Sequence, residues 1–114
     1  MSPAKALAAA QVRDAAQLFA ALGDATRLRL LQRLSSGGPA SITDLSARSE
    51  LTRQGITKHL TVLSKARLVR DERRGRERIW QVEERRLADA QDYLQRIASQ
   101  WDDALHRLKG FVEN

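Results

Sequence analysis

Hydrophobic residues recur every three or four positions along most of the chain, the spacing that places them on one face of an α-helix. The first predicted helix covers residues 12–22 and ends at Gly23. A second follows Asp24, because a carboxylate there can accept hydrogen bonds from the free N–H groups of a first helical turn. Its apolar arc is wide, so we expect this helix to lie at the centre of the core. The leucines that form the arc are Leu28, Leu31 and Leu34 on one face, with Leu30 beside them.

A short helix followed by a longer one is expected in the middle of the chain. The run 35–39, Ser-Ser-Gly-Gly-Pro, ends the second helix. A short third helix starts near Thr43 and ends around Ser49, and a brief connection leads to a fourth helix that Thr52 can cap. The apolar face of the fourth helix holds Ile56, Leu60 and Leu63. Two helices joined by so brief a turn form a helix-turn-helix candidate over about residues 43–66.

After the fourth helix the pattern changes to that of two strands. Residues 68–72 and 76–82 flank the turn Arg73-Arg74-Gly75, which predicts a β-hairpin, or wing, over about residues 68–82. With 114 residues the chain is long enough for one core and too short for two, so we treat residues 1–114 as a single domain. The predicted fold class is mainly α (α+β), a winged helix-turn-helix of about five helices and a two-stranded wing.

The last predicted helix, residues 85–109, carries one apolar stripe along its whole length of about 37 Å. A small domain cannot cover such a stripe alone, so we expect it to pack against a second copy of the chain, with residues 12–22 contributing. The alternative is a monomer whose last helix folds back on its own core. The stripe consists of Leu87, Ala90, Leu94, Ile97, Trp101, Leu105 and Leu108. The predicted dimer interface consists of Phe19, Leu94, Ile97, Trp101, Leu105 and Leu108.

The net charge of +6 is concentrated in one quarter of the chain. Residues 52–78 hold nine Lys and Arg against three Asp and Glu, whereas the remaining residues are balanced. Local basic charge is what binding to a polyanion rewards, because neutralised phosphates release their counterions. A solvated basic surface is the alternative, and charge alone does not separate the two.

The outer face of the fourth helix supplies candidate DNA-reading side chains, since amides, hydroxyls and ammonium groups can contact base edges and phosphates in a major groove. We predict base readout by Gln54, Thr57 and Lys58. Arg53, in the first turn, is shared between bases and phosphates. The residues expected to contact mainly the DNA backbone are Thr52, Thr61, Lys65 and the wing residues Arg73, Arg74 and Arg76.

Other chemistry is not indicated. The chain has no cysteine, so it forms neither disulfides nor thiolate metal sites, and it has no phosphate-binding loop or nucleophile motif. We expect no enzyme activity, cofactor or metal. His59 is interpreted as a packing or hydrogen-bonding residue, and Asp102 with His106 offers too few ligands for a stable metal site. Because Arg13 and Asp14 interrupt the Ala-rich start and no apolar run approaches a membrane span, we expect a cytoplasmic protein. Trp80 and Trp101 are either core or interface residues.

Three stretches resemble the ArsR family of bacterial winged helix-turn-helix repressors. They are residues 19–31 (FAALGDATRLRLL), residues 55–69 (GITKHLTVLSKARLV) and the wing residues 74–76 (RGR). The resemblance extends over about residues 18–82 and is specific because the stretches occur in this order and spacing. It implies a homodimer joined through its first and last helices, a recognition helix in the major groove, wings on the flanking DNA, and repression relieved by a signal.

The chain departs from the family pattern at the metal sites. Members that sense metals through thiolates carry cysteines around the third helix, where this chain has residues 43–47, TDLSA. Members that bind zinc through the last helix carry paired ligands there, where this chain has only Asp102, Asp103 and His106. The resemblance therefore implies a member without the usual metal sites.

The sequence supports one leading hypothesis and two alternatives. The leading hypothesis is a sequence-specific repressor of an adjacent operon that binds double-stranded DNA as a homodimer on a palindromic operator. The first alternative is an architectural protein that binds DNA without sequence preference. The second is a winged-helix module whose basic face binds another protein. An unidentified small-molecule effector, for example between the terminal helices, is left open.

Overall fold

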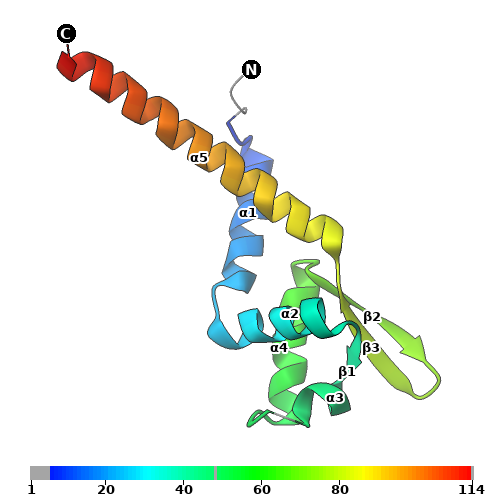
Figure 1. Ribbon diagram of the computed structural model, residues 1–114. Helices are drawn as coiled ribbons and strands as arrows, with labels where there is room; N and C mark the ends of the chain where they lie inside the picture. Colours follow the sequence, from blue (N-terminus) through cyan, green and yellow to red (C-terminus); the bar gives the residue numbers. More distant parts are fainter. Residues whose placement is uncertain (1–5, 48, 114) are drawn as a thin grey trace.

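The computed structural model describes residues 6–47 and 49–113. It confirms the predicted winged helix-turn-helix, with five helices in the described residues and a small antiparallel sheet at one side of the helical body (Figure 1). In chain order the elements are α1 (Ala9–Leu22), α2 (Ala25–Gly37), β1 (Ala40–Ser41), α3 (Ile42–Ser46), α4 (Arg53–Lys65), β2 (Val69–Arg74), β3 (Glu77–Val82) and α5 (Glu84–Glu113).

Side-chain caps set the starts of the central helices. The Asp24 carboxylate accepts a hydrogen bond from the backbone N–H of Arg27 at 3.1 Å, and the Thr52 hydroxyl accepts one from that of Gly55 at 3.0 Å, so both predicted caps are confirmed. Helix α3 starts at Ile42, one residue before the position predicted near Thr43, and its cap is Ser41. Ser41 and Asp44 form a reciprocal capping box, each side chain accepting from the other's backbone N–H at 3.1 Å, and this starts the helix earlier.

The end of α2 also differs from the prediction. The helix continues through Gly37, so the expected break over residues 35–39 starts too early. The chain turns at Gly38, whose φ of 79° lies in the region that glycine tolerates best. Two serines therefore extend the helix, and only the second glycine breaks it.

The sheet has three strands in the order β1-β3-β2, one more than predicted. Strands β2 and β3 pair up to Arg74 and Glu77, which leaves Gly75 and Arg76 as the turn. Gly75 has a φ of 63°, as the first central residue of a tight hairpin turn often requires. Arg73 and Arg74, predicted in the turn, are strand residues. The unforeseen strand β1 pairs with the middle of β3 and has two residues, too few to produce a periodic pattern.

The core lies where α2, α4 and the sheet meet, and α4 contributes the fully buried Ile56, Leu60 and Leu63. Leu30, Leu31 and Leu34 of α2 are also buried. Leu28 is 49% exposed, so its assignment to the buried face is wrong. It lies about 110° around the helix from the centre of the three buried leucines, beyond the reach of the core.

Helix α5 is one continuous helix of 30 residues that extends well beyond the body of the molecule (Figure 1). The described residues span 67 Å in their longest dimension. Near its start α5 packs on α1, and Ala90 and Tyr93 are buried there. Phe19 of α1 is half-buried against the core. From Leu94 onward the apolar side chains of α5 are exposed.

Candidate nucleic-acid interface

The polar side chains of α4 lie on the face turned away from the core. Its apolar residues are fully buried, and helix geometry therefore leaves the opposite face to solvent. This outer face carries Gln54, Lys58, Thr61 and Lys65, which are exposed, and Thr57, which is half-buried. Thr52 and Arg53 are exposed at the start of the helix.

Two threonines of this face are oriented by their own helix. The Thr57 hydroxyl donates to the carbonyl of Arg53, and the Thr61 hydroxyl donates to the carbonyl of Thr57, each at 2.8 Å. A hydroxyl that donates its proton in this way keeps its lone pairs as acceptors. Both side chains therefore present oriented acceptors on the outer face of α4.

Arg53 links the two helices of the helix-turn-helix. Its Nη1 donates to the Thr43 hydroxyl of α3 at 3.0 Å, which holds the guanidinium over the junction between α3 and α4. Arg53, Gln54, Thr57 and Lys58 line a shallow hollow of about 520 Å³ together with Ile42. Four predicted residues therefore face one space that a ligand edge can enter.

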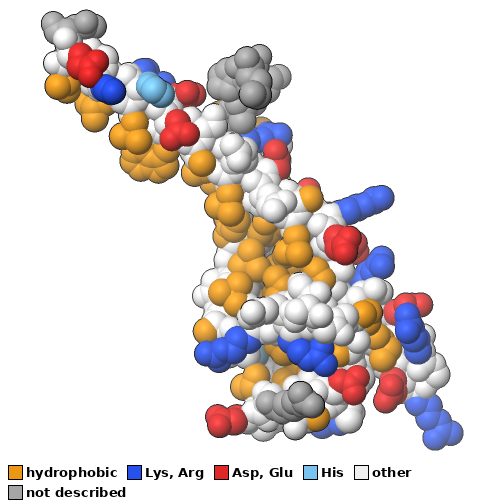
Figure 2. Space-filling view, viewed as in Figure 1, with side chains coloured by type: hydrophobic (Ala, Val, Ile, Leu, Met, Phe, Trp, Pro, Cys, Tyr) orange, Lys and Arg blue, Asp and Glu red, His pale blue; other side chains and the backbone are white. Residues whose placement is uncertain are grey.

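The wing concentrates arginines at the free end of the sheet (Figure 2). Arg73 and Arg78 are direct cross-strand partners, and like charges in such positions repel each other. Asp71 partly offsets this repulsion by accepting from Arg78 at 2.8 Å, and Glu72 lies 3.6 Å from Arg74. The strand pairing thus places positive charges together at a cost that an anionic partner would relieve.

The two tryptophans have different environments. Trp80 of β3 is 3% exposed and belongs to the core, and the Arg78 guanidinium lies 5.2 Å from its ring centroid. Its indole Nε1 is buried and has no hydrogen-bond partner within the described residues. Trp101 of α5 is 65% exposed. Trp80 is therefore a core residue, and Trp101 is available to a partner.

His59 packs among polar groups at the junction of α1, α2 and α4. Its Nδ1 lies 3.4 Å from Nη1 of Arg27 and 3.8 Å from the Asp24 carboxylate, which agrees with the predicted hydrogen-bonding role. Arg27 also donates to the carbonyls of Ala20 and Ala21 at the end of α1. The pKa of Asp24 is lowered, chiefly because its carboxylate accepts from the backbone of Arg27. These contacts hold the α1–α2 corner against α4.

A charged cluster that was not predicted from the sequence joins α1 to α5 around the buried Arg86. The Asp14 carboxylate accepts from both terminal nitrogens of Arg86, at 2.7 and 2.8 Å, and from the Tyr93 hydroxyl at 2.5 Å. Arg67 and Asp89 lie at its edge, 3.3 Å from Asp14 and 3.2 Å from Arg86 respectively. We call these five residues the Asp14 cluster.

Hydrogen bonding shifts the pKa values within the Asp14 cluster. The Arg86 guanidinium, followed by the Tyr93 hydroxyl, holds the pKa of Asp14 well below its ordinary value of 3.8. The bond to Asp14 raises the pKa of Tyr93 above 10.0. The cluster had a sequence signal, because Asp14 is spaced like a core residue before Leu18, and Arg86 before Ala90.

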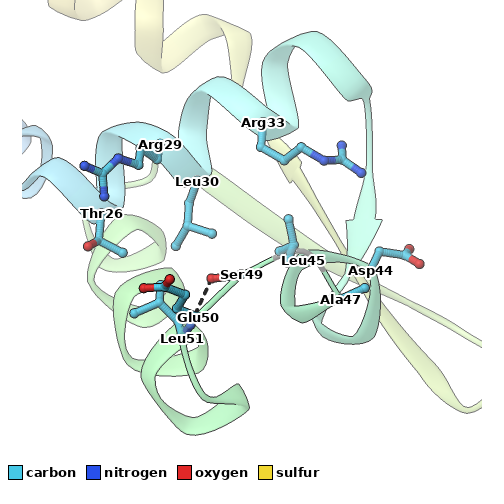
Figure 3. Close-up of a pocket in the computed structure, with 10 residues that line it drawn as sticks. All are labelled: Thr26, Arg29, Leu30, Arg33, Asp44, Leu45, Ala47, Ser49, Glu50 and Leu51. Atoms are coloured by element: carbon cyan, nitrogen blue, oxygen red, sulfur yellow. Dashed lines mark hydrogen bonds between the residues drawn. The ribbon is translucent and has the colours of Figure 1, made fainter.

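A groove of about 830 Å³ lies between α2 and the helix-turn-helix (Figure 3). Leu30 and Leu45 project into it from α2 and α3, and Glu50 and Leu51 close one end (Figure 3). The groove is therefore separate from the hollow on the outer face of α4, and it does not lie between the terminal helices.

Within residues 6–47 and 49–113 no three His, Cys, Asp or Glu side chains group closely enough to hold a metal ion. In the same part of the chain, no helix combines the length and the apolar character needed to cross a membrane.

Comparison with known proteins identifies the family. Residues 22–72 match the family model described as "Helix-turn-helix domain". The chain is 33% identical to the HTH-type transcriptional regulator Rv2034 of Mycobacterium tuberculosis over 93 residues, which cover 82% of this chain and 83% of that protein. It is 40% identical over 68 residues to the HTH-type transcriptional regulator YuzN of Bacillus subtilis, covering 54% of this chain and 74% of that protein.

A solved structure agrees with these relatives. An ArsR-like transcriptional regulator from Rhodococcus sp. RHA1 superimposes with a TM-score of 0.81 at 32% identity, covering 90% of this chain and 95% of that one. These relatives are named as regulators rather than as enzymes. The chain therefore belongs to the ArsR family of winged helix-turn-helix proteins and is a DNA-binding transcriptional regulator.

Proposed function

We propose that the protein is a homodimeric repressor that binds a palindromic operator next to its own gene. The observation that carries this proposal is the outer face of α4, where Arg53, Gln54, Thr57 and Lys58 converge on one hollow. A helix presenting such side chains suits the major groove. Since the chain has no cysteine, the signal that relieves repression is not a metal bound through thiolates.

The side chains divide into base-reading and backbone-contacting groups. Gln54, Thr57 and Lys58 read base edges, and Arg53 serves both a base and a phosphate from its place over the α3–α4 junction. A Gln amide suits adenine, and a Lys suits the acceptors of guanine. The groups that contact the DNA backbone are Thr52, Thr61, Lys65 and the wing arginines Arg73, Arg74 and Arg76.

The apolar face of α5 supports dimerisation. Leu94, Trp101, Leu105 and Leu108 are each more than half exposed, and Ile97 is 38% exposed. Figure 2 shows a band of hydrophobic side chains running along α5 toward the body of the molecule. A second copy packed on this band, with Phe19 contributing from α1, buries it and relates two recognition helices by a two-fold axis. Such symmetry requires a palindromic site.

Binding to the protein's own upstream DNA tests the proposal. Affinity is measured over a salt series against scrambled DNA of equal length. We expect a footprint on a palindrome and a preference of several kcal/mol for that site, about 4 or more. Equal affinity for both duplexes, falling in parallel with salt, would instead indicate architectural binding. A reporter fused to this promoter then distinguishes repression from activation.

Two variants of α4 distinguish base recognition from electrostatic attraction to the DNA phosphates. Gln54→Ala is expected to reduce the preference for the operator by about 1–3 kcal/mol while the salt dependence stays unchanged. Lys65→Ala, the matched control, is expected to weaken binding to both duplexes and to lower the salt slope by about one. A Gln54→Ala variant that keeps the full preference would remove this side chain from base readout.

A further inference from the structure

The Asp14 cluster connects the last turn of the recognition helix to the helices that form the proposed dimer. Arg86 of α5 donates through Nε to the carbonyl of Ala66, the residue that caps α4, at 2.8 Å. Its terminal nitrogens bind Asp14 of α1. A single side chain, 3% exposed, therefore ties α4, α1 and α5 together near the point where α5 begins (Figure 1).

The end of α4 is held on two sides. The last carbonyls of a helix lack partners within the helix and carry partial negative charge, so a guanidinium at this end is favourable. Arg67, the next residue, takes a left-handed backbone conformation with a φ of 62°, and its side chain reaches Asp14 at 3.3 Å. Arg86 thus holds the backbone at the end of α4, and Asp14 holds the side chain that follows.

A buried ion pair is a poor source of net stability, because removing both charges from water cancels much of their attraction. Its hydrogen bonds are directional, however, whereas apolar contacts are not. The leucines of α4 hold the helix against the core, but because their contacts are not directional they do not fix its rotation or its position along the helix axis as well as hydrogen bonds do. The cluster therefore contributes mainly to the position of α4 and less to the free energy of folding.

This position matters in a dimer joined along α5. The distance and angle between α4 and α5 within one chain determine how far apart the two recognition helices lie. Operator half-sites are separated by one helical turn of DNA or a multiple of it, so a small rotation of α4 moves both helices out of register. We infer that the Asp14 cluster sets this separation and that Asp14, Arg86 and Tyr93 are positioning residues for operator recognition. The inference rests on the proposed function.

The first test replaces the charges without leaving one of them unpaired. The double variant Asp14→Leu with Arg86→Met fills similar volume with apolar groups and removes the directional bonds. We expect a melting temperature close to that of the wild type, affinity for the operator reduced by about tenfold, and unchanged affinity for scrambled DNA. If the variant is as stable as the wild type and binds the operator equally well, the inference is overturned.

A milder variant covers the case in which the double variant does not fold. Tyr93→Phe removes one hydroxyl from Asp14 and leaves the ring in place. We expect a smaller loss of operator affinity, of about threefold, and a melting temperature lowered by about 5–10 °C. Unchanged operator affinity in this variant would contradict a positioning role for Tyr93.

A distance measurement tests the geometry without DNA. Since the chain has no cysteine, Val62→Cys on α4 and Gln91→Cys on α5 provide two unique sites for spin labels. Labelled protein is diluted with unlabelled protein, so that only distances within one chain contribute. We expect one narrow distance for the otherwise native chain and a broader or shifted distribution when the double variant or Tyr93→Phe is added. A narrow, unshifted distribution in both variants would overturn the inference.

The control is an ion pair of α5 that does not involve α4. Asp92 and Arg96 lie 3.1 Å apart, one turn along the helix. Asp92→Asn with Arg96→Gln is expected to leave both the α4–α5 distance and the operator affinity unchanged. If the wild type shows no operator preference, the proposed function fails, whereas the distance measurement still decides whether the cluster positions α4.

Discussion

The two halves of α5 carry the same apolar spacing but have different surroundings. In the first half Ala90 is buried and Leu87 packs on the core, beside the buried Arg86 and Tyr93. In the second half Trp101 is 65% exposed and Leu108 is 60% exposed. The apolar spacing of three and four residues runs through both halves without a break.

This difference shows what helical periodicity reports. The spacing identifies the apolar face of a helix that must be buried, and it does not say whether the surface that buries it belongs to the same chain. The first half finds its partners on α1 and at the end of α4. The second half extends beyond the body of the molecule, and a second copy is the partner we propose for it.

The largest effect is expected from removing the central aromatic residue of the second half. Trp101→Ala loses about 1.5–3 kcal/mol of apolar burial per chain, and therefore about twice that per dimer. Sedimentation equilibrium should show the dimer dissociation constant rising more than 100-fold, by about 3–6 kcal/mol. Asp103→Ala, about 160° away around the helix, is the control and should leave the constant unchanged. A wild type that sediments as a monomer would show that no second copy covers the second half of α5.

The next largest effect is expected in the first half. Arg86→Met leaves the Asp14 carboxylate without its main donor. Breaking a fully buried pair costs about 3–5 kcal/mol, and because the Asp14 side chain is 26% exposed we expect a loss near the lower end, about 3 kcal/mol. Urea denaturation at fixed protein concentration measures the free energy of unfolding. Arg96→Met, which disrupts a more exposed pair with Asp92, should cost less than about 1 kcal/mol. Equal losses of unfolding free energy in Arg86→Met and Arg96→Met would mean that burial does not determine how much each ion pair contributes.

Acid should weaken the contact of the first half of α5 with α1 through Asp14. Because the pKa of Asp14 is lowered in the folded protein, the unfolded chain binds more protons at acidic pH. The contribution of Asp14 is therefore present above the ordinary carboxyl pKa of 3.8 and is lost as the pH falls below it. Asp14 alone changes the free energy of unfolding by at most about 1.4 kcal/mol per pH unit. In denaturation curves between pH 5 and pH 2, Asp14→Asn should have a shallower dependence on pH than the wild type.

The smallest effect concerns the hydroxyl of Tyr93. Tyr93→Phe removes one hydrogen bond to a charged group, which typically contributes about 1.5 kcal/mol or slightly more. The loss should diminish at alkaline pH. The bond to Asp14 raises the pKa of Tyr93, so its contribution is complete below the ordinary value of 10.0 and declines as the pH rises through the raised value. A stability difference that does not change between pH 8 and pH 11 would contradict this account.

Local sequence features predicted most of the fold. Asp24 and Thr52 were recognisable as caps because a cap involves only its neighbours along the chain. Ser41 was overlooked although it caps α3 with Asp44, since its signal competes with that of Thr43 two residues later. The exposed leucine of α2, Leu28, shows the limit of a wide apolar arc, which marks more surface than the core can cover.

Contacts between distant residues were harder to predict. Asp14 and Arg86 are 72 residues apart, and no local pattern pairs them. Strand β1 is likewise defined by its partner, because Ala40 pairs with Trp80 only after the chain has folded. The outer face of α4 is a local feature instead, because helical geometry alone determines which side chains share that face, whereas their contacts with DNA stay a prediction.

Strand β1 has a consequence for the DNA. Ser41 pairs with Ile79 at the base of the wing and also caps α3, which packs against α4. Ser41 therefore links the wing to the helix-turn-helix, and the strands of the wing also contact α3 and α4 directly, so the two parts cannot easily be displaced relative to each other. A duplex held at both places must adjust its own groove width and bend. We expect base pairs that the protein does not touch to influence affinity through their stiffness, so that operators with flexible steps between the two contacts bind more tightly.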